Sequence, residues 1–126
     1  MTNPRYIPRS FCKDPDAFGL VEQVEWHSVP ATSEVEREAA VLQHRVAHKV
    51  RRLMRTQHGI EKVSALASAI GAPYDRLQKV LSGRVVMRLE DIARFRLAFG
   101  TDFDVAMMRT TSTTPPARLP RRVGRP

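Results

Sequence analysis

The sequence lacks several features that define large classes of protein. A single cysteine, Cys12, excludes an internal disulfide and favours a reducing compartment. No apolar run approaches the roughly 18 residues that a membrane span needs. The N-terminus, MTNPRYIPRSF, has no apolar stretch of the kind found in secretory signals. We therefore expect a cytoplasmic protein that does not contact a membrane.

The groupings of residues that carry catalysis are also missing. The sequence shows no paired carboxylates, no Ser-His-Asp set and no glycine-rich phosphate loop. His44 and His48 are four residues apart, a spacing that can hold zinc, but no third ligand accompanies them. We expect neither enzyme activity nor a metal or cofactor, and we interpret both histidines as surface or packing residues.

Positive charge is concentrated in the middle of the 126-residue chain, which suits one domain. Residues 1–44 carry four Lys and Arg against seven Asp and Glu, whereas residues 45–100 carry twelve against four. The remaining residues carry five against two, which completes the net charge of +8. A basic central segment indicates an anionic partner, with nucleic acid the first choice and a membrane surface the second.

Helical spacing of apolar residues, punctuated by glycine, predicts an all-α fold of about five helices. Each predicted helix is followed by a glycine that can adopt the left-handed conformation, except the last. These glycines are Gly59, Gly71, Gly83 and Gly100. Proline at position 73 fits a helix start, because its missing N–H is tolerated there. The predicted helices cover about residues 33–58, 61–70, 73–82, 88–99 and 101–109.

The first and longest predicted helix begins with a capping box, Ser33 with Glu36 three residues later. Its apolar stripe follows helical spacing: Val35, Ala39, Leu42, Val46, Val50 and Leu53. One straight helix and two helices joined by a kink both fit this pattern. The fourth helix has Leu89, Ile92, Phe95 and Phe99 in register.

Both ends of the chain differ from this central module, so we divide it into residues 1–32, 33–109 and 110–126. The first segment is an N-terminal extension in which a short helix is expected from Asp14 to about Trp26. Phe18, Val21 and Val24 would share one face of that helix, and Trp26 would pack against the module. The last segment, rich in Thr, Pro and Arg, is expected to be a disordered basic arm.

The segment LASAIGAPYDRLQKVLSGR, residues 66–84, predicts two short helices that cross at a tight turn. Such a pair leaves one face of its second helix free, and a helix fits the DNA major groove. The segment resembles the helix-turn-helix of the lambda-repressor-like family, also called the Xre or Cro type. The helix-turn-helix proper spans residues 61–83, and the similarity covers about residues 46–108. The motif positions are Leu66, Ala67, Gly71, Leu77, Val80 and Gly83.

The resemblance implies which residues contact DNA. The helix at 73–82 would read bases, and the neighbouring elements would contact the sugar-phosphate backbone. The expected base contacts are Tyr74, Asp75, Arg76, Gln78 and Lys79. The expected backbone contacts are Lys62, Ser64, Ser82, Arg84 and Arg88.

Two positions depart from the family pattern. Val63 stands where the family often has a DNA-contacting glutamine, so one contact is either missing or supplied by Lys62 or Ser64. Leu81 stands where the family commonly has a polar residue, so it would pack against the N-terminal extension or a partner chain.

The function expected from these residues is that of a sequence-specific regulator of transcription, a repressor in the first instance. The resemblance implies a homodimer on double-stranded DNA with an inverted repeat, with Phe103, Met107 and Met108 as candidate dimer contacts. The small size would suit a phage immunity repressor. The alternative is an antitoxin that binds a protein partner through its N-terminal region and autoregulates its own promoter.

Overall fold

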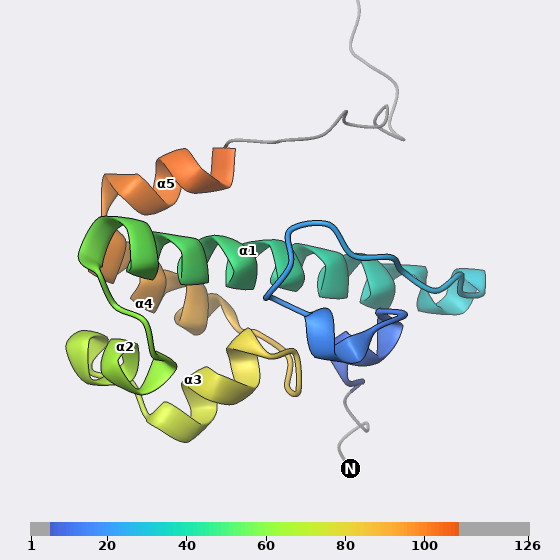
Figure 1. The fold of residues 1–126 in the computed structure, drawn as a ribbon. Helices are drawn as coiled ribbons and strands as arrows, with labels where there is room; N and C mark the ends of the chain where they lie inside the picture. The colour runs from blue at the N-terminus through green and yellow to red at the C-terminus, as the bar shows by residue number, and fades with distance from the viewer. Residues whose placement is uncertain (1–5, 109–126) are drawn as a thin grey trace, which may run out of the picture.

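The computed structural model describes residues 6–108 and confirms an all-α fold (Figure 1). Among these residues there are five α-helices, three short 3-10 turns and no β-strand. The elements are η1 (Pro8–Phe11), η2 (Pro15–Ala17), η3 (Ala31–Ser33), α1 (Glu34–His58), α2 (Val63–Ile70), α3 (Tyr74–Leu81), α4 (Leu89–Phe99) and α5 (Thr101–Met108). The predicted basic arm at 110–126 lies outside the described residues.

Helix α1 is one continuous helix of 25 residues, which settles the choice between a straight and a broken helix. The predicted capping box at its start is wrong, because the Ser33 side chain makes no hydrogen bond there. The turn η3 precedes α1, and Ser33 has a φ of −111° and a ψ of 6° rather than the extended backbone of an N-cap. The Ser33 N–H donates instead to the Pro30 carbonyl at 2.9 Å.

The buried face of α1 is rotated from the predicted apolar stripe. Val35 and Leu42 are exposed, at 81% and 52%, whereas Gln43 and His44 are buried. In Figure 1, α5 lies along only the C-terminal half of α1, where Leu53 is buried. The predicted stripe is therefore wrong for the N-terminal half of α1, where α5 does not run alongside the helix.

The predicted bounds of the later helices are confirmed within one residue, except that α2 begins at Val63, two residues after its predicted start. Pro73 is the N-cap of α3, and Tyr74 is its first helical residue. The glycines that end α1, α2 and α4, and the one that follows α3, all have positive φ. Leu89 departs from its predicted packing and is 81% exposed, because it is the first residue of α4 and projects from the end of the helix.

The N-terminal extension is not an α-helix, which overturns the prediction for residues 14–26. It forms a closed loop, in which Cys12 and Trp26 pair as an isolated antiparallel bridge. The Lys13 N–H donates to the Glu25 carbonyl, and the His27 N–H donates to the Phe11 carbonyl, both at 2.9 Å. These backbone bonds replace those that a helix would make, so residues 12–26 bulge toward the bundle.

The loop inserts Phe18 into the core, where the ring is 2% exposed. Phe18 makes edge-to-face contacts with Trp26 and His44, at ring distances of 6.3 and 5.4 Å. Trp26 therefore packs against the bundle, as predicted. Leu81 is fully buried, and the backbone of Gly19 passes close to the Leu81 carbonyl. The apolar residue at the end of α3 thus packs against the extension, one of the two predicted alternatives.

Phe103 also belongs to this core, since it is only 4% exposed. Met107 is partly buried against the same cluster, whereas Met108 is exposed. Phe103 is therefore unavailable as a dimer contact, because its side chain is used to hold α5 to the bundle. Cys12 is buried as well, and burial raises the pKa of its thiol, which disfavours the reactive thiolate.

Candidate nucleic-acid interface

Helix α3 has one buried and one accessible face, as its sequence predicts. Leu77, Val80 and Leu81 point into the core and are at most 4% exposed. Tyr74, at the start of the helix, is 52% exposed. Gln78, one turn later on the same side, is half-buried. A phenol and an amide therefore stand together on the accessible surface of α3, and both can donate and accept hydrogen bonds.

Asp75 and Lys79 form an ion pair across one turn of α3, with the Lys79 Nζ 3.1 Å from the Asp75 Oδ2. Both side chains are accessible, and exposed pairs of this kind contribute less than about 1 kcal/mol to stability. The pair can therefore open at little cost when Lys79 meets an acceptor. In the free protein Asp75 offsets the charge of Lys79, which weakens a purely electrostatic attraction to phosphate.

Arg76 does not point outward with its neighbours, which corrects the prediction for its orientation. Its Nη2 donates to the Asp91 Oδ2 at 2.6 Å and to the Val86 carbonyl at 3.3 Å, while its Nε lies 3.4 Å from the Asp91 Oδ1. Asp91 also accepts the Arg88 N–H at 2.8 Å. Arg76 thus joins α3 to the start of α4, because the fold places a partly buried carboxylate within its reach.

The five residues predicted to contact the DNA backbone lie around α3, not on it. Lys62 is the N-cap of α2 and is exposed, as is Ser64 in its first turn. Val63 between them is partly buried and packs against the core. The Val63 side chain is used in packing, so Lys62 and Ser64 are the accessible residues at this end of α2.

The other three backbone candidates follow α3. Ser82 is the C-cap of the helix, and its hydroxyl donates to the Lys79 carbonyl at 3.4 Å. Arg84 and Arg88 are exposed at either end of the segment between α3 and α4. Within the described residues, neither guanidinium forms an ion pair. Both cations are available to an anion.

Gln43 was not among the predicted residues, but it is a buried residue of α1 that hydrogen-bonds to the end of α3 and to the segment after it. The predicted stripe passed through Leu42 and so left Gln43 off the core face. Its position four residues before Ala47 and seven before Val50, both buried, would have indicated the correct face.

His44 is the second buried polar residue of α1, and it holds the extension. Its Nδ1 accepts the Gly19 N–H at 2.9 Å, which leaves the proton on Nε2, 3.1 Å from the Glu22 carbonyl. Both ring nitrogens are used in packing, in agreement with the structural interpretation of this histidine. In the described part of the chain, no three His, Cys, Asp or Glu residues are grouped to hold a metal ion.

We expect the protein to lose stability as the pH falls below about 6.5. Burial lowers the pKa of His44 from its ordinary value of 6.5, and burial likewise lowers the pKa of His48. The folded state therefore favours neutral imidazoles, whose contribution is complete above the unfolded pKa and is lost as the pH falls through the folded values. Denaturant unfolding between pH 8 and 5, with NMR titration of His44, checks this; a His44 pKa above 6.5 would contradict it.

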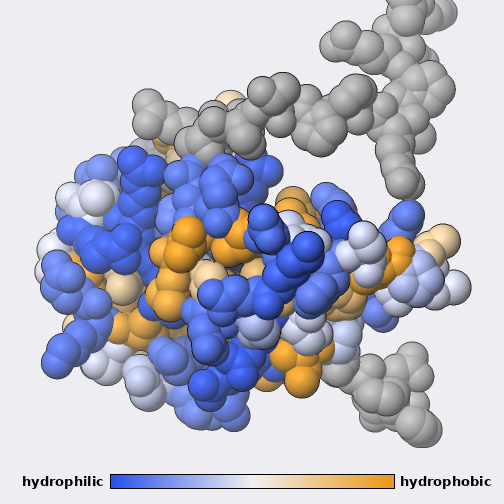
Figure 2. All heavy atoms as spheres, turned by 45° about the vertical axis from the view of Figure 1, so that its right-hand side comes forward, coloured by the Kyte–Doolittle hydropathy of each residue, from blue (hydrophilic) through white to orange (hydrophobic). Residues whose placement is uncertain are grey.

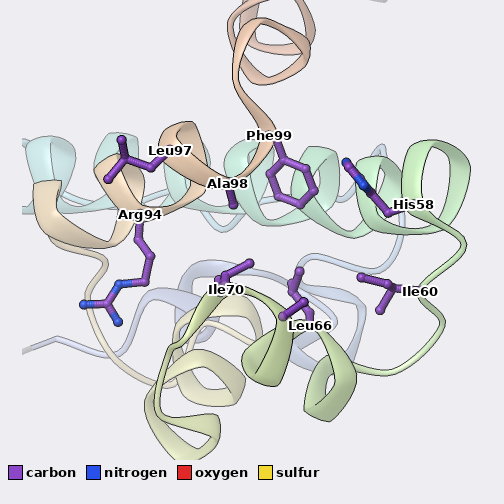
Figure 3. Close-up of a pocket in the computed structure, with 9 residues that line it drawn as sticks. His58, Ile60, Leu66, Ile70, Arg94, Leu97, Ala98 and Phe99 are labelled. Atoms are coloured by element: carbon purple, nitrogen blue, oxygen red, sulfur yellow. The ribbon is translucent and has the colours of Figure 1, made fainter.

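A hollow lies between α2, α4 and the end of α1 (Figure 3). Its volume is about 380 Å³. The close-up shows Leu66 and Ile70 of α2 facing Phe99 of α4, with His58 and Ile60 at one end. The lining is mostly apolar, and its two basic groups, His58 and Arg94, have no carboxylate or thiol beside them in the lining. The hollow therefore lacks the paired acid, base or nucleophile of an active site.

Figure 2 shows hydrophilic side chains over much of the visible face, interrupted by apolar groups in several places. None of the helices in the described range combines the length and apolar character needed to cross a membrane.

Comparison with protein-family models, curated proteins and solved structures found no match.

Proposed function

We propose that this protein is a cytoplasmic, sequence-specific regulator of transcription that places α3 in the major groove of double-stranded DNA. The observation that carries the proposal is the division of α3, which buries Leu77, Val80 and Leu81 while leaving Tyr74 and Lys79 accessible. A phenol, an amide and an ammonium on one protruding helix can hydrogen-bond to base edges. A helix used only for packing has no need of them.

The cations around α3 support the same proposal. Lys62 lies at the start of α2, the helix before α3 in the chain, and Arg84 and Arg88 follow α3. Positive charge therefore flanks the accessible helix on both sides in the sequence. Contacts of these groups to phosphates would set the position of α3 along the duplex without reading its sequence. Asp75 is the exception, because a carboxylate repels phosphate and can accept only from cytosine N4 among the bases.

Repression in this proposal requires no further domain. A protein that occupies a promoter excludes polymerase, and two copies on an inverted repeat would each place one α3 in the groove. Met108 and Val105 are the exposed apolar residues of α5, at 81% and 54%, and they replace Phe103 as dimer contacts in the proposal. A phage immunity repressor is one protein of this kind.

Selection of bound duplexes from a random library, followed by sequencing, tests the function. We expect an inverted-repeat motif with one half-site spacing, because two symmetric copies bind on one side of the duplex. Binding without a motif that vanishes as salt rises would leave only attraction to phosphate and would overturn the proposal.

Substitutions on the surface should separate base reading from phosphate contact. Tyr74→Ala or Lys79→Ala should reduce discrimination between selected and scrambled duplexes, by about 1–3 kcal/mol for a lost base contact. Arg84→Ala should weaken both duplexes equally and lower the slope of log K against log salt by about 1. Uniform loss in all three variants would show that α3 is not the reader.

The ion pair on α3 calls for a matched control. Lys79→Ala leaves the Asp75 carboxylate unpaired, and its charge would weaken binding to every sequence. The double variant Asp75→Asn, Lys79→Ala removes that charge. If the single and the double variant both lose discrimination between duplexes, the loss comes from Lys79. If affinity falls for every sequence in Lys79→Ala and is restored by Asp75→Asn, the loss comes from the unpaired Asp75 carboxylate.

The antitoxin alternative is supported by one observation on the extension. Ile7, Leu20 and Val21 are each at least half exposed, so their apolar side chains are accessible to a protein partner. Copurification of a small protein that is lost after Leu20→Ser and Val21→Ser, with DNA binding retained, would favour this function. A neighbouring gene for a small toxin would point the same way.

A further inference from the structure

Gln43 makes three hydrogen bonds, all to backbone groups far away in the chain. Its Nε2 donates to the carbonyls of Val80 and Val85, each at 2.9 Å. Its Oε1 accepts the Met87 N–H, also at 2.9 Å. The side chain is only 5% exposed, so water does not provide a ready replacement for these bonds.

The partners determine which end of the amide is which. Two carbonyls can only accept and one N–H can only donate, so the NH₂ group must face the carbonyls and the oxygen must face Met87. Both amide hydrogens and one oxygen lone pair are used. Glutamate in this place would turn an oxygen toward the two carbonyls, and methionine would leave all three backbone groups without this partner.

The three backbone groups belong to the part of the molecule that carries the phosphate candidates. Val80 lies in the last turn of α3, and Val85 and Met87 lie in the segment between α3 and α4. This segment has no regular secondary structure. It carries Arg84, and it ends at Arg88, the N-cap of α4. In Figure 1 it passes beside the middle of α1, the longest helix of the fold.

Two other short hydrogen bonds of this region hold the two ends of the segment. The Arg84 N–H donates to the Lys79 carbonyl at 2.9 Å, and the Arg88 N–H donates to Asp91 at 2.8 Å. Between them, the Arg76 guanidinium reaches the Val86 carbonyl at a longer distance of 3.3 Å. Gln43 therefore supplies the shortest side-chain bonds to the middle of the segment, and these bonds join it to α1.

We propose that Gln43 is a positioning residue for DNA binding, which holds Arg84 and Arg88 in a fixed relation to α3 so that the phosphate contacts and the base contacts are made together. The inference rests on the proposed function and deepens it by naming what sets the register. Gln43 touches no DNA itself. It acts through the backbone of residues 80–87, much as a second layer of hydrogen bonds orients the groups that contact a ligand.

The test compares Gln43→Met with a control of similar destabilisation. Methionine keeps the length and unbranched shape of the side chain and removes the three bonds. Leu53→Ala removes packing in the C-terminal half of α1, and Leu53 makes no side-chain hydrogen bond to the segment between α3 and α4. Both variants are studied well below their unfolding temperatures, on the full chain and with the duplex selected by the wild-type protein.

We expect Gln43→Met to bind the selected duplex at least tenfold more weakly and to lower the salt slope by about 1–2, the effect of losing one or two phosphate contacts. Leu53→Ala should keep the wild-type slope. In the free protein, hydrogen exchange at the Met87 amide should accelerate at least tenfold more in Gln43→Met than in the control, because only that variant removes its acceptor.

Double variants provide the sharpest comparison. If Gln43 acts through Arg84, then Arg84→Ala should cost much less affinity in the Gln43→Met background than in the wild type. Additive losses, or a salt slope unchanged by Gln43→Met, would overturn the inference and leave Gln43 as a purely structural residue. A wild-type protein that selects no duplex is a different result, since it would refute the proposed function itself.

Discussion

Replacing Gly83 with alanine should lower the free energy of unfolding by about 2–5 kcal/mol, from two causes that act together. Gly83 has a φ of +77°, a left-handed conformation that costs a residue with a Cβ about 1–2 kcal/mol. A Cβ at this position would also lie 2.7–2.9 Å from three ring carbons of Phe18. Phe18 is deeply buried and has no room to move away.

A matched control separates the two causes. Gly71 has a similar φ of +69°, but nothing lies within 4 Å of a Cβ built there. Gly71→Ala should therefore show only the backbone cost, about 1–2 kcal/mol. Denaturant unfolding of both variants makes the comparison, and equal losses would mean that Phe18 does not press on Gly83 in solution.

Replacing Phe18 with alanine should cost about 3–5 kcal/mol, the usual range for removing a buried phenylalanine ring. The ring fills the space between α1, Trp26 and the turn at Gly83, so its removal leaves a cavity and loosens the extension. Thermal or denaturant unfolding measures the loss. Limited proteolysis should show faster cleavage in residues 12–27.

Val21→Ala is the control for this prediction. A helical extension would bury Phe18 and Val21 on one face, whereas in the structure Val21 is 50% exposed. Its replacement should change stability by no more than about 0.5 kcal/mol. Comparable losses in the two variants would contradict the looped extension.

The two large effects should not add. Phe18→Ala removes the ring that a Cβ at position 83 would meet, so Gly83→Ala should cost less in that background, close to the value at Gly71. Such coupling would link the extension directly to the end of α3. Through this contact, together with the Arg9 N–H bond to the Gly83 carbonyl at 2.9 Å, the extension supports the surface proposed to meet DNA.

Local chemistry is enough to predict much of this molecule. Glycine and proline restrict or free the backbone of their own residue, so the ends of α1 to α4 could be read from the chain. The inward face of α3 also follows from spacing alone, because Leu77 and Val80 are nearly one turn apart. The accessible positions of Tyr74 and Lys79 were predicted for the same reason.

What the spacing could not predict depends on which surfaces meet across the fold. The stripe containing Val35 and Leu42 has helical periodicity, but periodicity does not say where a covering element stops. Both residues are exposed, and α5 lies along only the C-terminal half of α1. Arg76 was expected to face outward with its neighbours, but its guanidinium hydrogen-bonds to the carboxylate of Asp91, 15 residues later in the chain. Such partners are decided by tertiary packing, since the sequence carries no distance between them.

The sequence by itself determined the helices and the accessible side of α3, because both arise from interactions within a few residues. Only the tertiary structure decided how the extension folds and what Gln43 and His44 bind. Phe18 had the spacing of a helix, but the bridge between Cys12 and Trp26 and the space beside Gly83 make a loop the better way to bury it. Gln43 looks like one more polar residue of a long helix until the carbonyls of Val80 and Val85 are placed beside it.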